Sequence, residues 1–373
     1  MTALTTETAL DDLADAIATG TTVAGLGEST RFAHETFEVR DQLFRRLVRR
    51  HGFRALAVQD HVSVGATLDA YVTGGTGTAR SALASAWRPW RTAEMAAALE
   101  WIRAFNQDHP DDPVRIFGVK PAQAQPADYD VIMEHVRRAA PHRLAELAVH
   151  LEPIRTAHEI DEHVQRARGL HPGRPFAEHA RDALAIVEQS PGDSALERML
   201  LIVDFHQRSV AGRDNYAGDA QTWADTIVDH QHRTGRRVAY WDGIAHTSAA
   251  PATLGLAPQR GPQPTVGSVL RDHYGPRYVS AAIGFHHGDL GAVTIPEPAS
   301  DWLDARLGAT DEPAHWLDLR DDGWDGPMKA RVISGVYHPS RDAAEHLAVA
   351  SLPDAFDVLV HLRQVSPVHW LTT

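Results

Sequence analysis

The sequence predicts an α/β protein with a central, mainly parallel sheet flanked by helices and with a helical subdomain inserted into this core. The first observation is a βαβ pattern, in which apolar strands at residues 22–26 and 53–58 flank an amphipathic stretch that ends at His51. The second is the alternation of strand-like and helix-like segments along most of the chain. The third is a run of helical patterns over residues 127–209 without a convincing strand.

The opening segments define the first strand-to-helix turn. Residues 7–18 predict an amphipathic helix, and the strand that follows ends at Gly27-Glu28. Apolar residues then recur at helical spacing as far as Val48. We expect Ser29 or Thr30 to cap this helix and the strands at 22–26 and 53–58 to be a parallel pair. Backbone N–H groups and the helix dipole favour a carbonyl, carboxylate or phosphate at such a turn.

The elements up to residue 126 follow from the same patterns. We expect helices at 63–72 and 92–106, a strand at 114–119 and a linker at 121–126. The Gly/Thr cluster at residues 73–78 lacks the Gly-Lys-Ser/Thr of a phosphate-binding loop. It is therefore predicted to be a surface loop.

The remaining segments complete the domain division. Prolines interrupt the helical patterns of residues 127–209, and a helix at 216–233, a strand at 237–241 and a loop at 259–264 come next. Short strands are predicted at 278–283, 291–295 and 331–336, and the segment 355–362 completes the α/β pattern. The predicted core thus comprises residues 1–126 and 210–373, with residues 127–209 inserted.

Composition excludes several classes of function. The 373 residues contain no cysteine, which removes thiolate nucleophiles and cysteine-based metal sites. A net charge of −13 argues against non-specific nucleic-acid binding. The sequence shows no signal sequence and no apolar run long enough for a membrane span, so we expect a cytoplasmic protein that binds neither nucleic acid nor membrane.

Common catalytic and binding motifs are missing. The Gly-x-Ser-x-Gly of serine hydrolases does not occur, and Gly25-x-Gly27 lacks the third glycine of a dinucleotide fingerprint. His158 and His163 are five residues apart, unlike the i, i+4 pair of a zinc protease, and we expect a solvated helix there. The 23 histidines are scattered, so the sequence predicts no metal site.

Several patches together resemble one family. These are Gly27-Glu28-Ser29-Thr30-Arg31-x-x-x-Glu35 with Arg40, Gly52-Phe53-Arg54-Ala55, Trp90 with Glu94, residues 101–106, Arg213-Asp214, Trp241 with His246, and residues 354–361. In this order they are similar to the erythromycin esterase family. The resemblance implies an α/β fold with an inserted helical part. It also implies hydrolysis of a lactone ester by water that a histidine activates, without a required metal or other cofactor.

The resemblance also assigns positions in the site. The family's residues are retained at Glu28, Glu35, Arg40, Arg213, Asp214 and His246. Four positions depart from the family pattern: Arg31 replaces the essential histidine, Gln59 a glutamate, Lys120 an aspartate and Gly243 a histidine. Since an arginine stays protonated, Arg31 cannot act as a general base in the family's manner.

The departures change the expected chemistry of the site. Glu28 and His246 are the expected acid and base, with His34, three residues after Arg31, as an alternative base. The replacements add positive charge, so Arg31, Arg40, Lys120 and Arg213 are expected to bind a carboxylate or phosphate, with Glu35, Gln59 and Asp214 beside them. The competing interpretation is that Arg31 is an ion-pair partner of Glu28 or Glu35.

Three functions remain open from the sequence. The first is an altered enzyme that hydrolyses, dehydrates, isomerises or cyclises an anionic natural product or modified peptide without a cofactor. The second is a catalytically silent member of the family that binds a ligand or scaffolds a partner. The third is a metal-independent ester or lactone hydrolase that uses His34 as its base.

Overall fold

The computed structural model describes residues 1–4, 6–155, 173–189, 192–211, 216–320, 324, 326–333 and 337–372. The chain divides into two compact units. Unit 1 contains Met1–Pro121 and Ala217–Thr373, and unit 2 contains Ala122–Tyr216. Each unit is described by itself. His158 and His163, for which the sequence predicts a solvated helix, lie outside the described residues.

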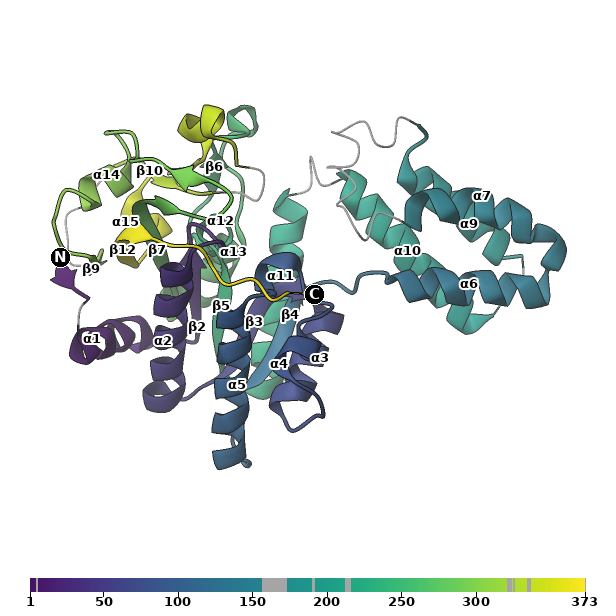
Figure 1. Ribbon diagram of the computed structural model, residues 1–373, viewed down its shortest axis with the longest axis horizontal. Coiled ribbons are helices and arrows are strands. Elements are labelled where there is room, and N and C mark those ends of the chain that lie inside the picture. The colour runs from purple at the N-terminus through teal and green to yellow at the C-terminus, as the bar shows by residue number, and fades with distance from the viewer. Residues whose placement is uncertain are drawn as a thin grey trace. The chain divides into compact units, whose positions relative to one another are not determined.

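Unit 1 is built on a large mixed sheet with the strand order β1-β9-β12-β7-β2-β5-β3-β4 (Figure 1). The strands are β1 (Thr2–Ala3), β2 (Val23–Glu28), β3 (Phe53–His61), β4 (Arg115–Lys120), β5 (Arg237–Gly243), β7 (Tyr278–Asp289), β9 (Ala314–Asp318) and β12 (Val358–Val365). The strands from β12 to β4 in this order are parallel, whereas β9 pairs antiparallel with both of its neighbours, β12 and β1. The short β8 (Thr294–Ile295) pairs with β7.

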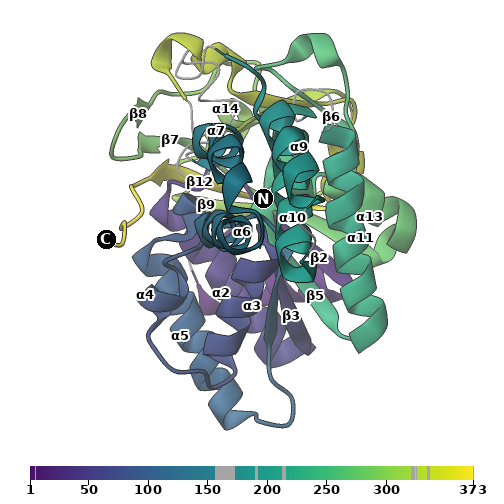
Figure 2. The same cartoon turned by 90° about the vertical axis from the view of Figure 1, so that its right-hand side faces the viewer.

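Helices cover both faces of this sheet (Figure 2). One face packs against α1 (Glu7–Ala18), α2 (His34–His51), α3 (Val62–Val72) and α5 (Ala93–Asp108). The other face packs against α11 (Tyr216–Thr234) and α13 (Val266–Tyr274). Side chains alternate as a strand requires: Leu26 of β2 faces the first core and Val23 the second. The mixed α/β class predicted from the sequence is confirmed.

A second, antiparallel sheet in unit 1 was not predicted. It consists of β10 (Met328–Arg331), β11 (His346–Val349) and β6 (Ala252–Leu254), and it packs with α14 (Leu303–Leu307) and α15 (Leu352–Ala355). The strand predicted at 331–336 is wrong for residues 332 and 333, because β10 ends at Arg331, and its residues 334–336 lie outside the described residues. Each strand of this sheet has only three or four residues, too few to show a clear period-two pattern in the sequence.

The pairing of β2 with β3 is a further correction. The two strands are parallel, but β5 lies between them and forms a ladder with each. The predicted N-cap is also wrong: α2 begins at His34 with Ala33 as its N-cap, and no side chain caps it. Ser29 and Thr30 lie in a longer turn. The other end of α2 is as the sequence suggests, since Gly52 adopts a left-handed conformation (φ 68°) that allows the chain to turn into β3.

Close contact between α3 and β4 depends on two glycines. A Cβ on Gly65 would lie 2.0 Å from the backbone nitrogen of Gly118, and a Cβ on Gly118 would lie 2.2 Å from the carbonyl oxygen of His61. Neither position has room for a side chain. This packing fixes the strand that ends at Lys120.

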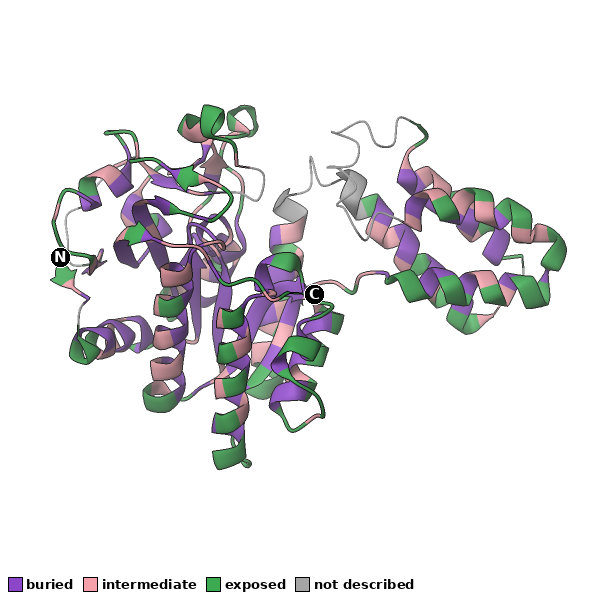
Figure 3. Cartoon of the chain, in the orientation of Figure 1, coloured by how far each residue is buried: buried purple, intermediate pink, exposed green. Residues whose placement is uncertain are grey.

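Unit 2 is helical within its described residues. Its main helices are α6 (Pro126–Ala139), α7 (Leu144–Arg155), α9 (Phe176–Val187) and α10 (Asp193–Ala211). They enclose their own apolar core, which includes Tyr129, Leu147, Ala180 and Met199 (Figure 3). None of the helices that the structure describes has the length and apolar composition of a membrane span.

Candidate functional site

Polar side chains gather where four parallel strands of unit 1 end. Glu28 ends β2, Asp242 lies near the end of β5, Gln59 near the end of β3, and Lys120 ends β4. These strands are consecutive in the sheet, and Gly27 is in register with Asp242. Because ligands of parallel α/β sheets bind outside the carboxyl ends of the strands, this edge is the candidate site.

A buried charge network forms its floor. Glu28 Oε1 accepts a hydrogen bond from Arg31 Nε at 3.2 Å, and its other oxygen forms an ion pair with Arg40. Arg31 also donates to Asp242 Oδ1 at 2.5 Å. Burial lowers the pKa of Arg40 to about 9, with the charges of Asp242 and Asp41 opposing the shift. Each oxygen of Glu28 is therefore paired with an arginine, and Glu28 fixes the positions of Arg31 and Arg40.

Asp242 is fixed from its own strand. Its Oδ1 accepts a hydrogen bond from the backbone N–H of Gly243 at 2.7 Å, and its Oδ2 accepts one from the hydroxyl of Tyr240. Burial, together with the charge of Asp242, raises the pKa of Tyr240 well above its ordinary value. The phenol thus stays a hydrogen-bond donor, and Asp242 is held for Arg31.

Cations and tryptophans form the outer layer of the site. The guanidinium carbon of Arg31 lies 4.5 Å from the ring centroid of Trp87. Lys120 Nζ lies 4.8 Å from the centroid of Trp87 and 5.2 Å from that of Trp223. The backbone N–H of Trp87 donates to Asp60 at 2.8 Å, which ties the tryptophan's loop to the end of β3.

The carboxylates of this site are buried more deeply than its outer cations. The side chain of Arg31 is 15% exposed, whereas those of Glu28 and Asp242 are 1% and 0% exposed. Lys120 is half-buried. Arg31, Lys120 and Trp87 therefore lie nearer to solvent than the two carboxylates.

His246 is the histidine of this site. It lies in the short helix α12 (Ile244–Thr247) directly after β5, with its Nε2 3.4 Å from Gln59 Nε2 and its ring 5.2 Å from that of Trp223. Burial lowers the pKa of His246; Asp242 opposes this shift, and Arg31 and Lys120 add to it. The half-buried imidazole is therefore neutral near neutral pH, as a general base must be.

The structure places two of the other predicted residues, Glu35 and His34, elsewhere. Glu35 accepts hydrogen bonds from the backbone N–H and the hydroxyl of Ser366, both at 2.6 Å. His34 bonds to Glu94 and packs against His369. The contacts described for Glu35 and His34 thus join them to the segment 366–371 and do not include the strand-end residues. Arg213 and Asp214 lie outside the described residues.

Several residues of the site were missed from the sequence. Asp242 lies near the end of a buried strand as Glu28 does, and this shared position was a usable signal. Trp87 and Trp223 gave no such signal in the sequence. Trp87 lies in a non-periodic loop, and Trp223 resembles any core residue of a helix. Arg31 pairs with Glu28, as the competing interpretation expected, and also with Asp242, 211 residues away in the sequence.

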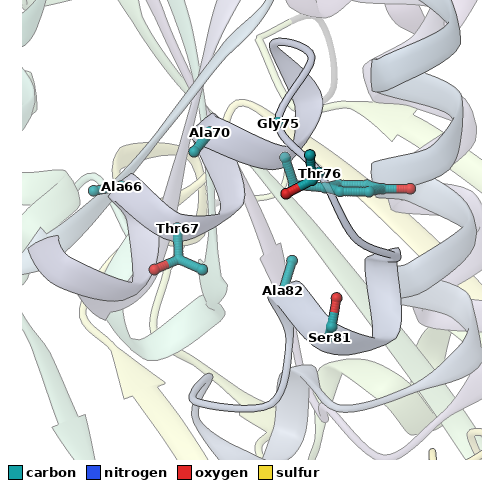
Figure 4. A pocket seen from close by; sticks show the side chains of 8 residues that line it. Ala66, Thr67, Ala70, Gly75, Thr76, Ser81 and Ala82 are labelled. Atoms are coloured by element: carbon teal, nitrogen blue, oxygen red, sulfur yellow. The ribbon is translucent and has the colours of Figure 1, made fainter.

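A separate hollow of about 580 Å³ lies on unit 1 (Figure 4). It is lined by Ala66, Thr67, Ala70, Tyr71, Gly75, Thr76, Ser81 and Ala82. The Gly/Thr loop at residues 73–78 contributes part of this lining. No charged residue is among these side chains, so the hollow has none of the chemistry found at the strand ends.

Comparisons with known proteins give a family and a fold. A family model described as erythromycin esterase matches residues 48–365, a span that begins after the turn of Glu28 and Arg31. No curated protein sequence matches the chain.

Three solved structures are similar. A protein from Bacillus cereus is 19% identical over 97% of this chain and 93% of that chain, with a TM-score of 0.67. A succinoglycan biosynthesis protein is 19% identical over 96% and 92%, with a TM-score of 0.63. A mutant of the erythromycin esterase EreC in its open conformation is 15% identical over 95% and 94%, with a TM-score of 0.58. Such identities show the fold alone. Since the family model matches most of the sequence, the chain belongs to the erythromycin esterase family.

Proposed function

We propose that this chain is a hydrolase-type enzyme that acts on an anionic ester by acid/base catalysis at the strand-end site. Family membership suggests the hydrolase-type function. The observation that carries the finer proposal is the neutral imidazole of His246 beside an outward layer of cations and tryptophans. His246 takes a proton from the attacking water, and Arg31 and Lys120 hold the substrate's negative group and the developing oxyanion.

The buried acids have a supporting role in this mechanism. Glu28 and Asp242 hold Arg31 from two sides, which keeps its guanidinium fixed and reduces reorganisation during the reaction. Trp87 supports both outer cations. Glu28 is thus proposed to position Arg31 and Arg40, a change from the acid/base role that the sequence suggested. The proposed substrate is a natural product or modified peptide with a carboxylate or phosphate near the scissile bond.

Paired model substrates test this proposal. Esters of 4-nitrophenol with a neutral acyl chain and with an ω-carboxylate chain of the same length differ only in charge. We expect kcat/KM to favour the charged ester by roughly 10- to 100-fold, the range for hydrogen bonds to charged groups. Lys120→Met should remove this preference. Lys329→Met, at a half-buried lysine paired with Asp301, is the matched control and should retain it.

The role of His246 is tested separately. His246→Asn should lower kcat by roughly 10²- to 10⁴-fold, as expected for loss of a general base. The matched control is His230→Asn, because His230 is also half-buried, stacks on Phe117 and has a pKa that burial lowers. The acid limb of the wild-type pH profile should lie below the ordinary histidine pKa of 6.5. Equal activity of the two variants would contradict the proposal.

A second candidate is a ligand-binding protein without catalytic activity. The engagement of both Glu28 oxygens by arginines favours it, since a carboxylate paired in this way is a poor group for proton transfer. Wild-type protein and His246→Asn, each incubated with a metabolite extract, would distinguish the two by mass spectrometry. A His246-dependent increase in ion mass by one water means hydrolysis, and a decrease by one water means elimination or cyclisation. A product of the same mass as its precursor means rearrangement. No change in any ion, with retained binding of carboxylates that Lys120→Met abolishes, would support the second candidate.

A further inference from the structure

A group of potential metal ligands lies apart from the strand ends. His34 is the first residue of α2, Glu94 lies in the first turn of α5, and His369 belongs to the segment 366–371. One ligand atom from each lies within 4.8 Å of the others. Nδ1 of His34 is 2.8 Å from Glu94 Oε1, and Nδ1 of His369 is 2.7 Å from the same oxygen.

Neighbouring groups hold these side chains in place. The backbone N–H of His369 donates to both oxygens of Glu94, at 3.1 and 3.2 Å. The other ring nitrogen of His34 lies 3.9 Å from Glu38. Carboxylates and backbone groups in such outer positions orient the ligands of metal sites. The backbone of His369 thus orients Glu94, and Glu38 places a negative charge near His34.

Backbone contacts keep the segment 366–371 against both helix starts. It forms bridges from Pro367 to Ala33 and from Trp370 to Thr92, and it crosses the starts of α2 and α5 (Figure 1). The backbone N–H of Ala93 also donates to the carbonyl of His369 at 2.7 Å. The three donors therefore come together through the fold of the backbone as well as through their own hydrogen bonds.

The two histidine side chains are exposed enough for a metal ion to reach them and for their rings to move. The side chain of Glu94 is 6% exposed, whereas those of His34 and His369 are 35% and 71% exposed. Zinc binds nitrogen and oxygen at about 2.0–2.2 Å, so tetrahedral ligands lie roughly 3.3–3.5 Å apart. Each imidazole must move outward by about 0.6 Å from its present hydrogen bond to reach this spacing. The exposed His369 has room for that shift.

We propose that His34, Glu94 and His369 bind one divalent transition metal ion, for which Zn²⁺ is the natural probe. Two imidazole nitrogens and one carboxylate oxygen are a common zinc ligand set, and they leave a fourth position for water. To bind the ion through Nδ1, each neutral imidazole carries its proton on Nε2, so the ion takes the place of any Nδ1 proton that faces Glu94. It fastens the segment 366–371 to the starts of α2 and α5, independently of the function proposed for the strand ends.

Metal binding by the whole chain tests this site. After removal of metal by a chelator and dialysis, Zn²⁺ titration should show one equivalent bound in the wild type and a rise in Tm. Glu38→Gln should weaken binding roughly 10- to 100-fold, the range for loss of a group that orients a metal ligand. Glu94→Gln and His369→Gln, which remove ligands, should weaken it further. His142→Gln, at an exposed histidine of unit 2, is the matched control and should bind as the wild type does.

Cobalt provides an independent readout. Co²⁺ in the same site should give visible absorption typical of a four-coordinate ion, and His369→Gln should lose it while its far-UV circular dichroism stays unchanged. If Glu94→Gln fails to fold, His369→Gln alone decides, since its side chain is largely exposed. Absence of stoichiometric Zn²⁺ binding in the wild type, or equal binding by His369→Gln, would overturn the proposal.

Discussion

The pair of Glu28 and Arg40 allows a quantitative test of the buried network. Both side chains are 1% exposed, and the guanidinium of Arg40 lies among the rings of Phe37, Trp90 and Trp241, with centroids at 5.0, 5.3 and 4.7 Å. Glu28→Gln keeps the shape of the side chain but removes its charge. The Arg40 cation then remains in a site that water does not reach.

The expected cost follows from this burial. Removing one partner of a buried ion pair costs about 3–5 kcal/mol, and the cation–π contacts of Arg40 do not change this cost because both proteins have them. We therefore expect Glu28→Gln to lower the free energy of unfolding by about 3 kcal/mol and Tm by roughly 10 °C. Adding Arg40→Met should recover most of the loss, because it removes the unpaired buried charge.

Tryptophan fluorescence in a urea titration is the appropriate assay. All nine tryptophans belong to unit 1, so the signal reports the unit that contains the pair. Glu100→Gln, at an exposed position of α5, is the control and should change stability by less than about 0.5 kcal/mol. A loss below about 1 kcal/mol in Glu28→Gln, or a double variant less stable than the single one, would refute the reasoning.

Three further predictions concern packing, pH and the outer layer. Gly65→Ala should lower the free energy of unfolding by about 1–3 kcal/mol, since the new methyl group would meet the backbone of Gly118; equal urea midpoints would contradict this. Burial lowers the pKa of His361 from 6.5 to about 3, so its stabilising contribution is complete above pH 6.5 and decreases as the pH falls toward 3. Between pH 7 and 4 that contribution should fall by about 3 kcal/mol, and His361→Gln should flatten the measured pH dependence accordingly. Trp87→Ala should leave stability nearly unchanged, because the ring is 39% exposed, yet raise KM for the charged ester roughly 3- to 30-fold by removing the support of Lys120.

Local patterns in the sequence predicted the individual elements of unit 1 well. The helix at residues 7–18 and the strand-helix-strand succession from residue 22 follow from apolar periodicity, and the structure has them with small shifts at the ends. Strand order was not predictable in the same way. A ladder between β2 and β5 joins segments far apart in the sequence, and no periodicity within either strand records which neighbour it takes.

The candidate site was predictable only in part. Glu28, Arg31, Gln59, Lys120 and His246 were identified from motif positions, and the structure gathers them at the strand ends. Asp242 was missed because its importance lies in the contact with Arg31 across two strands. The proximity of His34, Glu94 and His369 was not predicted either, since Glu94 is 60 residues from His34 and 275 from His369 and no linear spacing connects them.

The position of β5 between β2 and β3 has a consequence for how the protein folds. Unit 2 separates β4 from β5 in the chain, so residues 1–121 contain β2 and β3 without the strand that joins them. A fragment of these residues leaves both strands with unpaired inner edges, which favours aggregation over folding. The sheet closes only when a distant segment enters its centre, a step with a high entropic cost. The same strand brings Asp242 to Arg31, so the site is assembled in the step that completes the sheet.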